Sequence, residues 1–120
     1  MQEIKTETAP APLGPYSQAV KTGDTIYVAM QLPIGVEIDA SIEEQTKQVL
    51  DNVQNILVAA ESSMNKVVRT TVYLNDLSNG KDVNAIYKEY FDNILPARSV
   101  VNVPAIPFDY KIAVDVIATT

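Results

Sequence analysis

The amino-acid sequence predicts a single α+β domain spanning residues 1–120, in which two helices cover one face of a mixed β-sheet. Two segments, 41–61 and about 80–93, carry apolar side chains at the spacing of one helix face. The other apolar segments are short and rich in Val, Ile, Thr and Tyr, which is typical of strands. The predicted order is strand, strand, helix, long strand, helix, strand, strand, and this order favours a sheet with a helix layer on one face.

The first two predicted strands cover 16–22 and 25–30, and Thr22-Gly23-Asp24 between them indicates a hairpin turn. The Pro-rich stretch 9–15 before them is interpreted as a rigid turn rather than a polyproline ligand. The first helix follows. Ser41, with Glu44 three residues later, matches a capping box, which places the helix start near Ser41.

A long strand over 66–74 leads into the second helix, which must end before Pro96 because proline disfavours helix in the residue preceding it. Two further strands are predicted over 98–103 and 110–118. Alternation along the last one places Tyr110, Ile112, Val114, Val116 and Ala118 on one face and Lys111, Ala113, Asp115 and Ile117 on the other. Since the second face keeps apolar side chains, we expect self-association.

Composition excludes several kinds of chemistry. The chain has no Cys and no His, which removes thiolate nucleophiles, thiolate metal sites and imidazole proton transfer. We expect neither a metal nor a cofactor, because no ligand cluster or phosphate loop is present. A net charge of −6 disfavours nucleic acid and anionic membranes as partners. With no long apolar run or secretion signal, the expected location is cytoplasmic.

The clearest candidate for ligand binding is Arg98 in Pro96-Ala97-Arg98-Ser99. A proline-fixed bend delivers this arginine to the start of a strand, where its guanidinium can grip a carboxylate with two parallel hydrogen bonds. A surface or interface salt bridge is an equally good interpretation. The other arginine, Arg69, lies within the long strand and is interpreted as a solvent-facing or ion-paired residue.

Three further residues carry groups suited to chemistry. Asp115 is flanked by apolar residues in the last strand, so it is a candidate acid or base, although pairing with a Lys across the sheet is the leading interpretation. Tyr16, after Gly14-Pro15, and Asn84, early in the second helix, can each hydrogen-bond a ligand or serve in packing or capping.

Six stretches together resemble one family. They are Gly14-Pro15-Tyr16-Ser17-Gln18-Ala19, Gln31-Leu32-Pro33, Glu44-Gln45-Thr46 with Val49-Leu50-Asp51-Asn52-Val53, Val68-Arg69-Thr70-Thr71-Val72-Tyr73-Leu74-Asn75-Asp76, Val83-Asn84-Ala85-Ile86-Tyr87, and Pro96-Ala97-Arg98-Ser99. In this order and spacing they look like the RidA/YjgF family of reactive-intermediate deaminases, also named endoribonuclease L-PSP. The resemblance runs nearly end to end.

The resemblance implies a chorismate-mutase-like subunit in a homotrimer, with small-molecule clefts between subunits. It also implies hydrolysis of 2-imino or 2-enamino acids to 2-keto acids and ammonia. Arg98 would hold the substrate carboxylate as the catalytic residue, Tyr16 would line the cleft from the neighbouring subunit, and Asn84 would lie nearby. Imines hydrolyse unaided, so a site that aligns substrate and water can suffice.

Four cleft positions depart from the family pattern. Ala29 and Met30 stand where a Ser-Gly pair is usual, Val100 where Cys is common, and Ala113 where deaminating members carry a Glu. Asp115, two residues on along the same strand face, is the possible substitute for that Glu. Two alternatives to a deaminase stay open, a trimeric carboxylate-binding protein with weakened turnover and, less favoured, an endoribonuclease.

Overall fold

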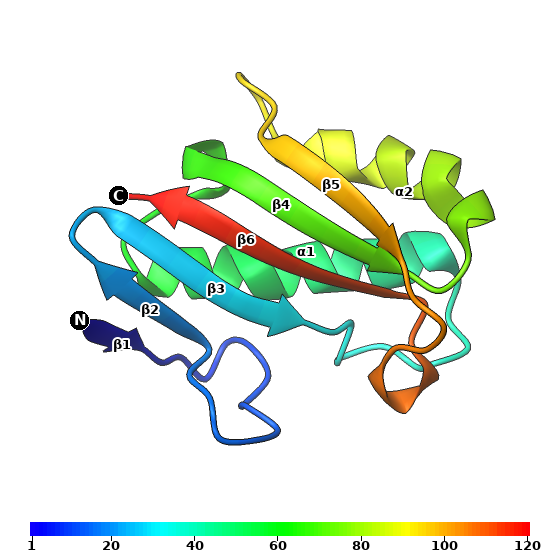
Figure 1. The fold of residues 1–120 in the computed structure, drawn as a ribbon, viewed down its shortest axis with the longest axis horizontal. Helices are drawn as coiled ribbons and strands as arrows, with labels where there is room; N and C mark the ends of the chain where they lie inside the picture. The colour runs from blue at the N-terminus through cyan, green and yellow to red at the C-terminus, as the bar shows by residue number, and fades with distance from the viewer.

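Residues 1–120, all described by the computed structural model, form a six-stranded sheet with two helices packed on one face (Figure 1). The strands are β1 (Gln2–Ile4), β2 (Ala19–Thr22), β3 (Thr25–Gln31), β4 (Val67–Leu74), β5 (Ala97–Asn102) and β6 (Ile112–Thr119), and the helices are α1 (Ile42–Ala59) and α2 (Gly80–Tyr87). Single turns of 3₁₀ helix occur at Met64–Lys66, Leu77–Asn79, Lys88–Tyr90 and Pro107–Asp109. The predicted α+β class, with both helices on one side, is confirmed.

The sheet is mixed, as predicted, and its strand order is β1-β2-β3-β6-β4-β5. Only β4 and β5 run parallel, and α2 forms the crossover between them. The other neighbours are antiparallel, including β6, which lies between β3 and β4. Consequently β3, β4 and β5 all run in the same direction.

The core lies between the helices and the sheet. Helix α1 buries a continuous stripe against it, comprising Val49, Leu50, Val53, Ile56 and Leu57, each fully buried. The helix begins where predicted, because the Ser41 hydroxyl accepts a hydrogen bond from the Glu44 backbone N–H at 3.1 Å. This stripe fixes α1 across the sheet and leaves the opposite sheet face uncovered by helix (Figure 1).

The N-terminal strands differ from the prediction. Strand β1 was not predicted, because its three residues are short and mostly polar, and it pairs with β2 at the sheet edge. The predicted strand 16–22 begins only at Ala19. The residues before it belong to a loop, where the Gln18 side chain bonds loop backbone groups. The predicted hairpin is confirmed, with Gly23 at a positive φ of 57°.

Two boundaries further along the chain were also wrong. The second helix ends as α-helix at Tyr87 and tightens into one 3₁₀ turn, so it does not reach residue 93. Tyr110 does not share the face of Ile112, since Phe108 and Asp109 adopt positive φ values of 61° and 64° just before the strand. That turn interrupts the alternation, and Tyr110 packs instead in a small second cluster with Ala113.

The sheet face away from the helices is partly apolar. Tyr27 is 47% exposed and Val101 39% exposed. Arg69 is exposed, as predicted, and donates a hydrogen bond to the Ser99 hydroxyl at 2.7 Å.

Neither helix is long and apolar enough to cross a membrane.

Candidate functional site

Arg98 lies near the start of β5, the edge strand of the sheet. Its ladder partner is Thr70 on β4, which is fully buried under the helices, so both side chains project toward the helix layer. There the Arg98 guanidinium carbon stands 4.7 Å from the centroid of the Tyr87 ring. This is the geometry of a cation–π contact.

The Tyr87 ring beneath Arg98 is held on several sides. Its hydroxyl lies 2.8 Å from the Thr70 hydroxyl, and its ring packs 4.8 Å from the Phe91 ring. Burial raises the pKa of Tyr87, while the Thr70 hydrogen bond and the charge of Arg98 act in the opposite direction. Because its pKa is raised, the Tyr87 phenol is neutral near pH 7. The face of its ring lies toward the Arg98 guanidinium.

Arg98 and Asn84 line one hollow of about 330 Å³. The other lining residues are Tyr87 at the end of α2, Lys88 in the 3₁₀ turn that follows, and Leu95 and Pro96 from the loop before β5. The structure thus brings Asn84 and Arg98 to the same hollow. Lys88 adds a second cation, which gives the hollow a chemistry suited to an anion. Val100 lies two residues beyond Arg98 on the same face of β5 and is 43% exposed.

Tyr16, Ala29 and Met30 lie together in a different place. They line an apolar hollow of about 500 Å³ between the loop before β2, the end of β3 and the turn before β6. Leu13 and Phe108 complete much of its wall. The Tyr16 hydroxyl accepts a hydrogen bond from the Leu13 backbone N–H at 3.1 Å, which turns the side chain back toward its own loop.

The two hollows do not meet within one chain. Strands β6 and β4 separate β3 from β5, and Met30 is near the end of β3 whereas Arg98 is near the start of β5. Because these strands run in the same direction, the two residues lie toward opposite ends of the sheet (Figure 1). A ligand held by Arg98 is therefore out of reach of Tyr16 of the same chain.

Ala113 and Asp115 belong to β6, on the face away from the helices. Ala113 is fully buried in the second cluster with Leu32, Ile106 and Tyr110. Asp115 accepts a hydrogen bond of 2.8 Å from the Tyr73 hydroxyl, so its partner is a tyrosine and not the Lys that was predicted. This bond raises the pKa of Tyr73. No group of three or more Asp or Glu side chains is placed to hold a metal.

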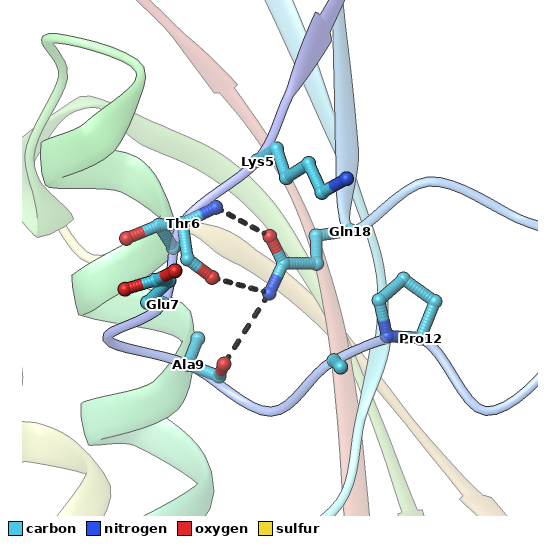
Figure 2. Close-up of a pocket in the computed structure, with 7 residues that line it drawn as sticks. Lys5, Thr6, Glu7, Ala9, Pro12 and Gln18 are labelled. Atoms are coloured by element: carbon cyan, nitrogen blue, oxygen red, sulfur yellow. Dashed lines mark hydrogen bonds between the residues drawn. The ribbon is translucent and has the colours of Figure 1, made fainter.

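A third hollow, of about 570 Å³, lies beside the N-terminal loop and is lined by Lys5, Thr6, Glu7 and Gln18 among others (Figure 2). Gln18 is buried, and its amide bonds the backbone on both sides, accepting from Thr6 N–H at 2.8 Å and donating to the carbonyl of Thr6 at 3.1 Å. Its amide nitrogen also lies 2.9 Å from the Pro10 carbonyl. These hydrogen bonds of the Gln18 side chain stabilise the loop that carries Tyr16.

Sequence reasoning did not identify Tyr87 and Lys88 as parts of the Arg98 hollow. A signal for both was present. They follow Asn84 by three and four residues, and residues at that spacing share one face of a helix. The contribution of Leu13 and Phe108 carried no such signal, because it depends on how two loops fold.

Comparisons with known proteins identify the family of the chain. A sequence model of the family described as Endoribonuclease L-PSP matches residues 6–120. A RutC family protein of Pyrococcus abyssi is 47% identical over 96% of this chain and 94% of its own length. The 2-iminobutanoate/2-iminopropanoate deaminase of Mus musculus is 42% identical over 96% of this chain and 88% of its own.

Solved structures give the same result. The YjgF gene product of E. coli superposes with a TM-score of 0.93 at 39% identity, covering 99% of this chain and 98% of that one. E. coli TdcF, solved with bound serine, superposes with a TM-score of 0.94 at 34% identity, covering 100% and 99%. On the strength of the full-length sequence match and the shared fold, this chain belongs to the RidA/YjgF family, also called the Endoribonuclease L-PSP family.

Proposed function

We propose that this chain hydrolyses 2-imino acids and their enamine tautomers, of the size of 2-iminobutanoate and 2-iminopropanoate, to 2-keto acids and ammonia. The observation that carries the proposal is the Arg98 guanidinium, held against the Tyr87 ring at the edge of the sheet beside Asn84. Deaminase names of relatives at 42% and 43% identity, from mouse and Arabidopsis thaliana, support the reaction class.

In this proposal Arg98 binds the substrate carboxylate through two parallel hydrogen bonds, a geometry that a planar guanidinium supplies. Water forms a C–O bond at C2 of the imine, and the electron pair of the C=N bond moves to nitrogen, which takes up a proton. The hydroxyl proton of the resulting carbinolamine then passes to the same nitrogen as the C–N bond breaks and the carbonyl forms, so that ammonia leaves. The products are the 2-keto acid and ammonia, with one water consumed.

The proposed site is completed by a neighbouring subunit. Arg98 and Asn84 form one half, Tyr16, Ala29 and Met30 form the other, and the two halves are far apart on a single chain. We propose a homotrimer in which the halves of adjacent subunits meet three times. The partly apolar sheet face, with Tyr27 and Val101 exposed, supports assembly through that face.

A carboxylate-binding protein with little turnover is the second candidate, and Ala113 is the observation that favours it. The position where deaminating relatives are expected to hold a Glu is a fully buried methyl group among Leu32, Ile106 and Tyr110. Asp115 is tied to the Tyr73 hydroxyl. The attacking water would then be positioned only by the alignment of the substrate. For a reactive imine, alignment alone supplies a large part of the rate enhancement.

The test is release of ammonia and 2-keto acid from freshly generated 2-iminobutanoate, measured against the uncatalysed rate. A deaminase accelerates the reaction in the wild type and loses the acceleration in Arg98→Ala. Ala113→Glu is compared with Ala113→Gln, which has the same size without the charge. If the wild type does not accelerate hydrolysis but binds 2-ketobutanoate through Arg98, the binding protein is correct; if only Ala113→Glu is active, the missing carboxylate is the reason.

A further inference from the structure

We propose that Tyr87 is a positioning residue for the carboxylate grip, and that it holds the Arg98 guanidinium in place without using any of its hydrogen-bond donors. The inference rests on the proposed function, since it concerns how Arg98 meets its ligand. Arg98 sits on an edge strand whose residues are mostly exposed. A long, exposed side chain at such a position loses considerable rotamer freedom when it is ordered.

The Tyr87 ring supplies that order. The guanidinium carbon lies 4.7 Å from the ring centroid, well within the range of a cation–π contact. The contact is made to the face of the Tyr87 ring, and none of the five guanidinium N–H donors of Arg98 is engaged in a hydrogen bond with the protein. An aspartate or glutamate partner would instead have occupied the donors that a substrate carboxylate requires.

The ring itself is fixed by the sheet. Tyr87 is 6% exposed, and its hydroxyl bonds the hydroxyl of Thr70 at 2.8 Å. Thr70 is also the residue that pairs with Arg98 in the parallel ladder between β4 and β5. Thr70 therefore pairs with the backbone of Arg98 and also hydrogen-bonds the tyrosine whose ring lies under the guanidinium. Both ends of the Arg98 side chain are thus held relative to the same buried residue.

Three variants separate positioning from packing. Tyr87→Leu removes the ring, Tyr87→Phe keeps the ring and removes only the hydroxyl, and Tyr90→Leu is the control. Tyr90 is a partly buried tyrosine three residues later that bonds Asp51 and packs against the same core, and its recorded polar contacts lie away from Arg98. The measurements are KM and kcat for 2-iminobutanoate and the dissociation constant of 2-ketobutanoate.

For Tyr87→Leu we expect KM and the dissociation constant to rise roughly three- to thirty-fold with little change in kcat, the range of a cation–π contact. Tyr87→Phe should recover most of the loss, and Tyr90→Leu should leave both constants unchanged. A residue that merely packs would lower the amount of active protein, which reduces apparent kcat and leaves KM alone. That pattern, or equal KM effects in Tyr87→Leu and Tyr90→Leu, would overturn the proposal.

A second readout needs no activity. The chain contains two arginines, so the NMR spectrum of their side-chain Nε–Hε groups has two signals, with Arg69 as an internal reference. The Arg98 signal should carry a ring-current shift in the free wild type and in Tyr87→Phe, and lose it in Tyr87→Leu. If the shift behaves so but the wild type neither binds nor hydrolyses, the positioning is correct and the proposed function is wrong. If the chemical shift of the Arg98 Nε–Hε signal does not change in Tyr87→Leu, Tyr87 does not position the guanidinium.

Discussion

Arg98 combines an ordered position with unused donors, because the group that orders it is the face of Tyr87 and not a carboxylate. The hollow beside it also contains Lys88, whose charge adds to the attraction for an anion. The two cations differ in what they can do. A guanidinium matches the two oxygens of a carboxylate, whereas an ammonium acts as a point charge.

This difference predicts the behaviour of Arg98→Lys. The charge is kept, but the two-pronged hydrogen bonding and the contact of the guanidinium with the Tyr87 ring are lost. We expect the affinity for 2-ketobutanoate to fall roughly ten- to a hundred-fold, the value of a hydrogen bond to a charged group. Calorimetric titration measures it, with Lys88→Arg as the control that keeps both charges. An affinity for Arg98→Lys equal to that of the wild type would show that charge alone suffices.

We expect the stability of the protein to fall in alkali, because the pKa values of Tyr73, Tyr87 and Tyr90 are all raised. For Tyr90 the main cause is burial, followed by the hydrogen bond that its hydroxyl donates to Asp51 at 2.7 Å. A raised pKa means that the folded state keeps the proton after the unfolded state has lost it. The associated stability is therefore complete below pH 10 and falls as the pH rises further.

Tyr90→Phe tests this linkage. The variant cannot titrate at residue 90, so its free energy of unfolding should fall less steeply than that of the wild type as the pH rises above 10. Denaturant unfolding at a series of pH values from 8 to 11 measures the two slopes, under the same salt. Parallel slopes would mean that Tyr90 has the same pKa in the folded and unfolded states.

Among the elements, the loop between β1 and β2 depends on one side chain. Gln18 is 2% exposed and bonds backbone groups of Thr6 and Pro10, as well as a longer contact of 3.4 Å to the carbonyl of Ala9 (Figure 2). The backbone carbonyl of Gln18 accepts a hydrogen bond from the backbone N–H of Ala29 on β3. The loop that carries Tyr16 and the strand that carries Ala29 are thereby held together by the same residue.

Gln18→Ala should therefore loosen this loop. We expect a loss of about 1–3 kcal/mol in the free energy of unfolding, the cost of leaving buried polar groups without partners. Hydrogen exchange of the Thr6 amide should accelerate more than exchange in β6. Gln18→Glu is the matched variant, since it can accept from Thr6 N–H but its carboxylate cannot donate to Pro10. If Thr6 exchange is unchanged in Gln18→Ala, the side chain does not hold the loop.

The elements that the sequence predicted well are those whose pattern is local. The spacing of apolar residues predicted the buried stripe of α1, and the Ser41 side chain predicted the helix start. The structure confirms both. Strand β1 was missed because three mostly polar residues gain their stability from pairing with β2. The face of Tyr110 was wrong because a turn with two positive φ values precedes the strand.

At the scale of the whole molecule, the sequence names candidate site residues one by one but does not specify how the fold groups them. The resemblance to a known family implied that Asn84 lies near Arg98, and both residues line one hollow of the structure. The contact between Arg98 and Tyr87 depends on the side-chain rotamers, which alternation and helical spacing do not specify. That Tyr16 and Arg98 lie toward opposite ends of the sheet follows from the strand order, which no local pattern in the sequence encodes.

The distance between the two halves leads to the prediction that decides the assembly. If each site takes Arg98 from one subunit and Tyr16 from the next, then Arg98→Ala and Tyr16→Ala inactivate different halves. Each variant alone should be nearly inactive. After the two are mixed, unfolded and refolded together, one site in about four pairs an intact Arg98 with an intact Tyr16, because the chains join a symmetric ring at random.

We therefore expect equal mixing to restore about a quarter of the wild-type rate in a cyclic trimer of random composition. Light scattering should give a mass near three times the 13.1 kDa of one chain. The control is Arg98→Ala refolded with the double variant Arg98→Ala/Tyr16→Ala, which has no intact Arg98 and should stay inactive. Failure of the mixture to recover any activity, with a trimeric mass, would mean that Tyr16 and Arg98 do not serve one site across an interface. Recovery with a monomeric mass would contradict a site shared between subunits, so the two measurements together test the arrangement of the site as well as the number of subunits.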